Sequence, residues 1–459
     1  MARESKDRLL GYLREGAPLS AAQQLKLTML LALPAILAQF SSVLMQYIDS
    51  AMVGRLGANP AASVGLVSTS VWILNGFSMA VMTGFSVQIA HACGAKDGKR
   101  ARLVMRQGLL TIFLFSLVLG ILGLAVSSPL PAWLGGDEAI RSDASRYFFI
   151  IAAFSPIGAT GYLAAASLQA SGDMKVPSII YICMGVMDVV FNYLFIYKLG
   201  MGVTGAAWGT GLAQTIATVF GIWYVTTQSK DLKLRGEGGP LLPSALTLKT
   251  AFGITGPLWI QNIVMRGAYV MSTIIVAPLG PVSIAANSFA ITAESFCYMP
   301  GFGLEESATT LVGQSLGAKR KELARGFART TIGMAMLIMG SLAVLMYAFA
   351  PQIMRFLSVD AEVVALGARV LRIEAFVEVF YAIAIVGSGV CAGAGQTMVP
   401  TVINFGTMWL VRIVLALILT PTMGLVGYWV AMAIDLTVKG LAFAIYIRGG
   451  HWMKKSIPA

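Results

Sequence analysis

Long apolar runs alternate with short polar segments along nearly all of the 459 residues of the chain. A helix needs roughly 20 apolar residues to cross a bilayer. Runs of that length predict six spans in the first half, at 27–53, 61–90, 103–126, 147–170, 176–197 and 204–227. Six more are predicted at 250–278, 282–311, 327–350, 367–392, 399–420 and 425–447. The pattern therefore predicts an all-α polytopic membrane protein with twelve transmembrane helices.

The composition supports a lipid environment for most of the chain. Hydrophobic residues make up 57% and charged residues only 12%, whereas a soluble domain is about one quarter charged. A soluble protein this apolar could not cover its surface with polar groups. The first 26 residues carry both signs of charge and lack the apolar core of a signal peptide, so we expect them to form a surface segment that precedes the first span.

The net charge of +12 is explained by short basic loops between the apolar runs. Two of these loops, 94–106 and 317–329, are rich in Lys and Arg. Because basic loops stay on the cytoplasmic side, we place both termini in the cytoplasm and the chain in the cell membrane. The same explanation removes the need for a nucleic-acid partner.

The two basic loops also repeat one another. Gly94-Ala95-Lys96 matches Gly317-Ala318-Lys319, and the offset from 94 to 317 is 223 residues. The same offset relates Pro34 to Pro257. A nearly constant offset indicates a duplicated unit. Since six spans per copy is an even number, both copies have the same orientation, which predicts two six-helix bundles related by a pseudo-two-fold axis along the membrane normal.

This duplication predicts a transporter with two lobes. We expect an N-terminal lobe at 1–229, a cytoplasmic linker at 230–249 and a C-terminal lobe at 250–459. Transporters built from parallel repeats bind substrate between the halves near the middle of the membrane. The charged linker contains Gly and Pro, which would let the two halves move relative to each other.

Local sequences in this frame resemble the multidrug and toxic compound extrusion (MATE) family. The similarity covers nearly the whole chain, and the segments that carry it are YIDSAMVGRLGA from Tyr47, SLQASGDMKVP from Ser167, GVTGAAWGT from Gly202, MPGFGLEESATTLVGQSLGAKRKE from Met299 and GVCAGAGQTMVP from Gly389. The resemblance implies cation-coupled antiport, in which a proton or sodium ion enters while a small amphipathic, often cationic compound leaves the cell.

The chain departs from one branch of that family. NorM-like members place an acid in the seventh helix, where this chain has Met265 and Arg266. The usual acid of helix ten is also displaced, since Tyr381 lies near that position and Glu378 lies one turn earlier. The pattern is nearer to the DinF-like members than to NorM-like members with a sodium site. We therefore expect proton coupling, with sodium as the alternative, and no organic cofactor or structural metal.

Two acids lie within apolar runs of the N-terminal half, Asp49 and Asp188. A charge at the bilayer centre costs roughly 2.5–3.5 kcal/mol on insertion scales and usually marks a pathway or a pair. In the second copy these positions are Ser272 and Val411, so the fold itself does not need the acids. No base lies within the two runs that hold these acids, 27–53 and 176–197, which predicts a proton or cation site.

Two polar residues complete the predicted coupling site. Asn192 lies one helical turn from Asp188 on the same face. DinF-like members carry an Asn and an Asp one turn apart in helix five, although in the reverse order. Thr210 matches a polar threonine of helix six in that family. The structural alternative is that these acids lock helices together through hydrogen bonds.

The C-terminal half mixes acids and bases within its apolar runs. Asp435 and Lys439 are four residues apart on one predicted helix, which favours mutual neutralisation. We expect Arg266 and Arg412 to pair with acids on neighbouring helices. Structural pairing is thus the main prediction for this half, and Glu378 is the candidate for a second coupling residue.

The substrate cavity is predicted only weakly. Polar, aromatic and flexible side chains in helices one, two and seven are the candidates: Gln39, Gln46, Tyr47, Trp72, Gln261, Asn262 and Met265. Met suits promiscuous pockets because it is flexible and polarisable. The expected partners are small amphipathic or cationic substrates and the lipid bilayer, and a monomer is the expected state.

Other classes of protein fit less well. An ATP-driven pump needs the phosphate loop G-x-x-x-x-G-K-[ST], and the nearest string, GAKDGKR, has too few intervening residues. With only His91 and His451 and no convergent catalytic set, an enzyme is not indicated. A channel would not need two lobes. A lipid-linked saccharide flippase of the same superfamily stays open, since Arg266 and Arg412 would suit pyrophosphate.

Overall fold

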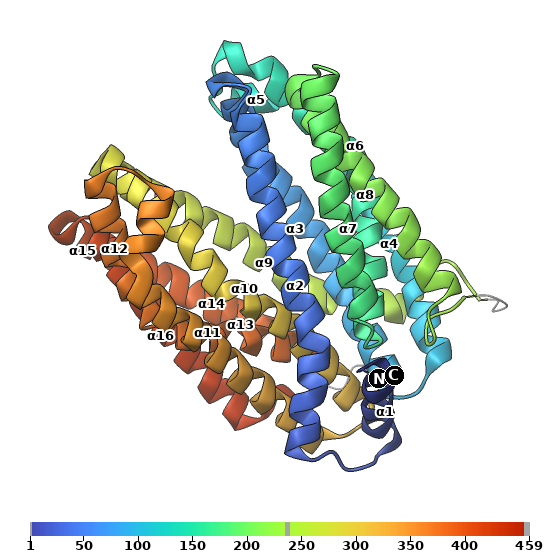
Figure 1. The fold of residues 1–459 in the computed structure, drawn as a ribbon. Helices are drawn as coiled ribbons and strands as arrows, with labels where there is room; N and C mark the ends of the chain where they lie inside the picture. The colour runs from blue at the N-terminus through green and yellow to red at the C-terminus, as the bar shows by residue number, and fades with distance from the viewer. Residues whose placement is uncertain (1, 235–238, 454–459) are drawn as a thin grey trace. The chain divides into compact units, whose positions relative to one another are not determined.

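A computed structural model describes residues 2–234 and 239–453, and all regular structure among them is helical. The first half begins with a short helix and is then dominated by long ones (Figure 1). Its elements are α1 (Ala2–Glu15), α2 (Ala21–Gly54), α3 (Ala58–Gly94), α4 (Gly98–Val126), α5 (Leu130–Trp133), α6 (Glu138–Ala170), α7 (Lys175–Tyr193), η1 (Leu194–Lys198) and α8 (Gly202–Thr227).

The second half repeats this order with more interruptions. Its elements are α9 (Ala245–Val276), η2 (Ala277–Leu279), α10 (Pro281–Gly317), α11 (Lys321–Leu357), α12 (Ala361–Ala375), α13 (Glu378–Gly393), α14 (Met398–Gly406), η3 (Thr407–Ile413), α15 (Val414–Met423), α16 (Leu425–Gly449) and η4 (His451–Met453). All twelve predicted runs are helical, which confirms the fold class. The fifth and eleventh contain π-helical segments, and the tenth is broken.

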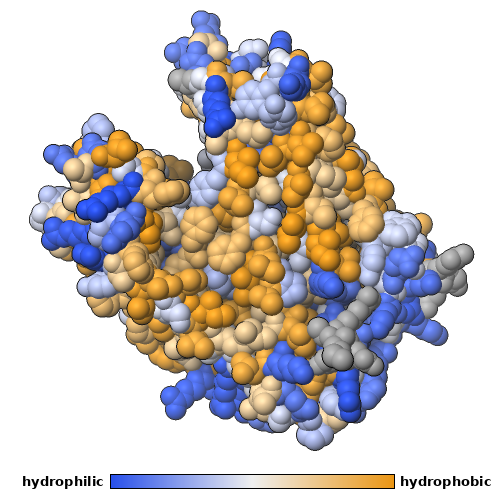
Figure 2. Space-filling view, viewed as in Figure 1, coloured by the Kyte–Doolittle hydropathy of each residue, from blue (hydrophilic) through white to orange (hydrophobic). Residues whose placement is uncertain are grey.

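The protein is a multi-pass membrane protein. Nine described helices are long and apolar enough to span a bilayer, or ten when α12 and α13 count as one bent span. Apolar side chains point outward along them: Val118, Ile121 and Leu122 of α4 are each more than half exposed. Figure 2 shows broad apolar areas on the face in view, with hydrophilic residues gathered near its edges. Outward apolar faces are what a lipid solvent requires.

The duplication also appears in the backbone. Among the described residues, only two that are not glycine have a positive φ, namely Lys96 at 58° and Lys319 at 59°. They are the third residues of the two Gly-Ala-Lys segments. The left-handed conformation is uncommon for side chains other than Gly, Asn and Asp, so its recurrence at the same offset confirms that the two copies share one loop geometry.

Contacts divide the described residues into two compact units. One unit contains the residues up to 36 together with those from 257 onward, and the other contains 37–256. The division falls within α2 near Pro34 and within α9 at Pro257, both inside their helices. The predicted lobes, 1–229 and 250–459, stay a prediction.

The unit of residues 37–256 is built around α6, which packs on α3, α4 and α8. Glycines allow the closest approaches between its helices. A side chain at Gly161 of α6 would overlap Thr218 of α8, and one at Gly205 of α8 would lie 2.8 Å from the carbonyl carbon of Phe195. Small residues at such crossings let helices in lipid gain van der Waals contact.

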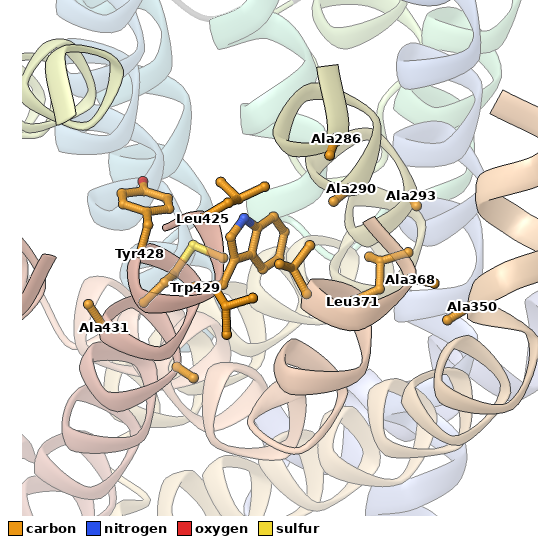
Figure 3. Packing of buried hydrophobic residues seen from close by; sticks show 14 of the residues in the cluster. Ala286, Ala290, Ala293, Ala350, Ala368, Leu371, Leu425, Tyr428, Trp429 and Ala431 are labelled. Atoms are coloured by element: carbon orange, nitrogen blue, oxygen red, sulfur yellow. The ribbon is translucent and has the colours of Figure 1, made fainter. Parts of the chain in front are cut away.

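The other unit has two fully buried tryptophans, and Figure 3 shows one of them, Trp429 of α16. The indole nitrogen of Trp429 donates a hydrogen bond to the Asn287 Oδ1 atom at 2.9 Å. Ala286, Ala290 and Ala293 present a small-residue face of α10 to the same core. The bonded indole avoids the penalty for a buried donor without an acceptor.

The N-terminal segment is packed on protein. Leu9, Leu10 and Leu13 of α1 are buried, and the Arg320 guanidinium donates to the carbonyl oxygens of Tyr12 and Leu13 at 3.0 and 3.1 Å. α1 thus packs on α10, in the contact unit that contains the second half, whereas its assignment to the N-terminal lobe stays a prediction. A short amphipathic helix buries its leucines wherever an apolar groove is available.

Candidate functional site

A polar cluster joins three helices of the unit 37–256. The Asn192 side-chain nitrogen donates to Asp49 Oδ1 at 2.9 Å and to Asp188 Oδ1 at 3.1 Å. Asp188 and Asn192 lie one turn apart on α7, and Asp49 comes from α2. Thr210 of α8 lies within hydrogen-bonding reach of Asp188. All four residues predicted for cation coupling are therefore in one cluster.

The cluster is largely shielded from solvent. Asp188 and Asn192 are 8% and 1% exposed, whereas Asp49 and Thr210 are partly exposed. The hydroxyl of Tyr197 in η1 donates to the Met52 carbonyl at 2.7 Å, which holds α2 near α7 just beyond Asp49. A partly exposed acid such as Asp49 can exchange an ion with water, because its buried partners Asp188 and Asn192 stay in place.

The two carboxyl groups lie close together, since both Asp49 and Asp188 accept a hydrogen bond from the same side-chain nitrogen of Asn192. Neither forms an ion pair with a basic side chain among the described residues. Two adjacent carboxylates cannot both stay charged in a low-dielectric site. A shared proton or a bound cation resolves the repulsion, and no other charge in the cluster does.

Asn192 also has an unused hydrogen-bond acceptor. Its Oδ1 atom is buried and forms no hydrogen bond with a described residue. It faces Gly209 of α8, where a Cβ atom would overlap it. Just after Asn192 the chain changes from α- to π-helix at η1, a form often found at functional sites. The cluster thus offers an amide oxygen beside two carboxyl groups.

We predict that Gly209→Ala separates α8 from the cluster. The added Cβ would overlap Asn192 Oδ1 and lie 3.0 Å from the Asn192 backbone nitrogen, so α8 must move or Asn192 must turn. Overpacking of this kind costs about 1–3 kcal/mol. We expect a lower melting temperature of the purified protein. We also expect a large loss of transport, measured as drug resistance of an efflux-deficient host.

Gly221→Ala on the same helix is the matched control. The nearest atoms to its Cβ are 3.9 Å away, and Ala is a better helix former than Gly by about 1 kcal/mol. We expect unchanged or raised stability and unchanged transport. Equal behaviour of the two variants would show that Gly209 has no special role at the site.

A second set of charges is buried in the other unit. The Arg412 Nη2 atom lies 2.8 Å from Asp435 Oδ2, and the Lys439 Nζ atom lies 3.5 Å from the same oxygen. All three residues are less than one tenth exposed. The expected Asp435–Lys439 pair is confirmed, and Asp435 is the neighbouring acid expected for Arg412.

Three glutamates beside this triad change the prediction for the second half. Glu374 and Glu378 are fully buried and Glu294 is 6% exposed. No oxygen of Glu374 or Glu378 meets the geometry of a hydrogen bond with a described residue, although the Cys297 thiol lies near Glu378. The prediction that the acids of this half are structurally paired is wrong for Glu374. Its carboxyl group, like those of the first cluster, needs a proton or a cation.

The helix that carries two of these glutamates is broken between them. α12 and α13 meet at 59°, and the turn is held by Val377 N–H donating to the Glu374 carbonyl and by Phe380 N–H donating to the Val377 carbonyl, both at 2.9 Å. Broken helices near mid-membrane hold ions in many transporters. The run predicted at 367–392 gave no sign of this break, since neither Gly nor Pro lies at it.

The predicted cavity residues remain dispersed over two units. Gln39, Gln46, Tyr47 and Trp72 belong to one unit, and Gln261, Asn262 and Met265 to the other. Tyr47 and Trp72 are exposed. Gln261 accepts a hydrogen bond from the Thr401 hydroxyl at 3.2 Å. Their role in a substrate cavity stays a prediction.

Comparison with known proteins identifies the family. The family model described as MatE matches residues 34–194 and again 257–418. The two matches start 223 residues apart, from 34 to 257, which is the offset of the internal repeat. This chain belongs to the MATE family. Members of this family are transporters, so the chain is not an enzyme.

Similar proteins are named as multidrug resistance proteins. The chain is 25% identical over 433 residues to the probable multidrug resistance protein NorM of Thermotoga maritima, covering 93% of each chain. It is 26% identical over 442 residues to the multidrug resistance protein MdtK of Yersinia enterocolitica, covering 93% of this chain and 94% of the relative.

Solved MATE structures share the fold. The Vibrio cholerae MATE transporter VcmN in its bent form has a TM-score of 0.86 at 18% identity and covers 95% of this chain and 99% of its own. A crystal structure of a MATE protein in complex with MaL6 has a TM-score of 0.88 at 20% identity and covers 96% and 100%. At this identity the likeness establishes the fold, with its two bundles, and not the substrate.

Proposed function

We propose that this MATE chain is a proton-coupled antiporter that exports amphipathic, often cationic compounds by alternating access of its two lobes. The observation that carries the proposal is the pair Asp49 and Asp188, held side by side by Asn192 without a base. Relatives named multidrug resistance proteins support drugs as substrates, and the acid pair supports cationic ones.

The exchange follows from the shared charge of the pair. With a proton on it, the cluster carries one negative charge fewer and has little attraction for a cationic compound. When the proton leaves, the extra charge attracts the cation or pulls the helices of the site into another packing. Because one pair cannot hold both ligands at full affinity, binding of one favours release of the other.

The buried glutamates of the second unit are a second candidate for coupling. Four acids, Glu294, Glu374, Glu378 and Asp435, surround two bases, Arg412 and Lys439. If all were charged, the set would carry an excess of two negative charges. Protons on Glu374 or Glu378 would remove the excess, and their position at a broken helix would link protonation to its bend.

We predict that a pH gradient drives transport and a sodium gradient alone does not. Met265 and Arg266 stand in the seventh helix where NorM-like members place an acid, and this supports proton over sodium coupling. Purified protein in liposomes, tested with a panel of cationic dyes, gives the measurement. Dye efflux driven by sodium at equal pH on both sides would overturn proton coupling, and Glu378→Gln tests whether the second cluster contributes.

The flippase alternative receives less support from the charges. A lipid-linked pyrophosphate needs free cationic groups, but Arg412 is neutralised by Asp435 at 2.8 Å. The unpaired groups of both clusters are acids. We further propose that the chain acts as a monomer in the cell membrane. Both termini lie in the cytoplasm in this proposal, because the basic loops favour that orientation.

A further inference from the structure

A groove of about 1280 Å³ opens on the unit that contains the second half of the chain. Side chains of α11, α12 and α16 line it, and these helices are labelled in Figure 1. No residue of either acid cluster lines this groove. Along α12 the side chains Ala365, Arg369, Arg372 and Phe376 are exposed, whereas Glu374 is buried on the other side of the helix.

The groove collects three guanidinium groups. Arg355 of α11 and Arg369 and Arg372 of α12 line it, and all three are exposed. No acid lines the groove, and none of the three forms an ion pair with a described residue. Asp360 at the rim instead caps α12 by accepting from the backbone N–H groups of residues 362 and 363. Glu362, also near the rim, is exposed to solvent.

Aromatic rings hold one of the three guanidinium groups, that of Arg372, in place. The guanidinium of Arg372 lies over the Tyr347 ring, 5.5 Å from its centroid, and its Nε atom is 3.4 Å from the Tyr347 carbonyl oxygen. The Phe376 ring stands edge-on to Tyr347 at 5.4 Å. A guanidinium stacked on a ring keeps its outer N–H groups free to bind an anion.

The position of these arginines along α12 is unusual for exposed bases. Arg369 and Arg372 follow Ala361, the first residue of α12, by roughly 12 and 16 Å at 1.5 Å per residue. A bare guanidinium at such depth in lipid is costly, and it either extends toward the headgroups or binds an anion. Beside the groove, Phe356 and Val359 are 90% and 104% exposed, which provides apolar surface.

We propose that this groove binds the phosphate headgroup of an anionic phospholipid, with the acyl chains along the exposed apolar side chains of α11 and α12. Three bases without an acid match the charge of the phosphate, and Arg binds phosphate with two parallel hydrogen bonds. A cationic substrate would be repelled here, so the groove is distinct from the transport site. The proposal does not depend on the coupling ion.

Native mass spectrometry of the full-length protein in detergent tests the proposal. The protein is mixed with phosphatidylglycerol, with phosphatidylethanolamine of the same acyl chains, or with phosphatidylglycerol plus excess inorganic phosphate. We expect retained phosphatidylglycerol, at least about tenfold less retained phosphatidylethanolamine, and no displacement by phosphate. The double variant Arg369→Gln/Arg372→Gln should lower retention about thirtyfold, since each of the two bases near a surface contributes about 1 kcal/mol and about 1.4 kcal/mol is tenfold.

Arg448→Gln, which removes an exposed base at the end of α16, is the matched control and should retain lipid as the wild type does. Melting without lipid checks that the double variant is folded, and Arg355→Gln alone provides a second, milder test of the same groove. Equal retention of the two lipids, displacement by inorganic phosphate, or unchanged retention in the double variant would each overturn the proposal.

Discussion

Replacing Asp49 with Asn should reduce proton-driven efflux to the background of empty liposomes while the protein still folds. The amide oxygen of Asn can accept the hydrogen bond that Asn192 donates at 2.9 Å, so the helices stay in place. What is lost is the group that shares a proton with Asp188. Efflux of dyes from liposomes with a pH gradient, and resistance of an efflux-deficient host, are the measurements.

Two further variants separate chemistry from packing at this site. Asp49→Glu retains a carboxyl group and should keep part of the activity, whereas Asp188→Asn should lose it as Asp49→Asn does. Melting temperatures near that of the wild type would show that the loss is not unfolding. Normal efflux by Asp49→Asn would remove this residue from the coupling mechanism.

Replacing Asp435 with Asn should be strongly destabilising. The carboxylate lies 2.8 Å from Arg412 and 3.5 Å from Lys439, and all three residues are buried. Removing one partner of a buried ion pair costs about 3–5 kcal/mol, because the charge left behind has no counter-ion. We expect a large fall in melting temperature or in yield relative to the wild type. Both proteins are expressed by the same protocol and measured in detergent.

The first copy of the repeat provides the control for that prediction. At the positions of Arg412, Asp435 and Lys439 it has Val189, Ala213 and Ala217, at offsets of 223, 222 and 222. A triple variant that takes these three residues removes both partners of each ion pair together and should be more stable than Asp435→Asn. If the single variant is as stable as the wild type, the pair does not hold α16 to η3.

Several features of this fold could be predicted from the sequence. Each of the twelve apolar runs is helical, because a backbone in lipid must satisfy its own hydrogen bonds. The repeat at an offset of 223 reappears as two family matches and as the left-handed Lys96 and Lys319. The pair Asp188 and Asn192 could be placed on one face, since residues four apart on a helix are neighbours.

Partners from other helices could not be predicted in this way. The contact of Asp49 with Asn192 joins residues 143 positions apart, and no periodicity encodes such a distance. The break between α12 and α13 has no Gly or Pro to signal it, and Glu374 is buried beside that break. The same holds for the three arginines of the groove, which two helices bring together.

The sequence by itself therefore determined the membrane solvent, the helices, the duplication and the acids that the fold does not need. These features depend on local composition and on the comparison of the sequence with itself, and neither requires knowledge of which helices are neighbours. The tertiary structure decided which charges are neutralised: Asp435 has two bases, whereas Asp49, Asp188 and Glu374 have none in contact. A charge is stabilised by whatever lies within a few ångströms of it, and helix packing alone sets those distances.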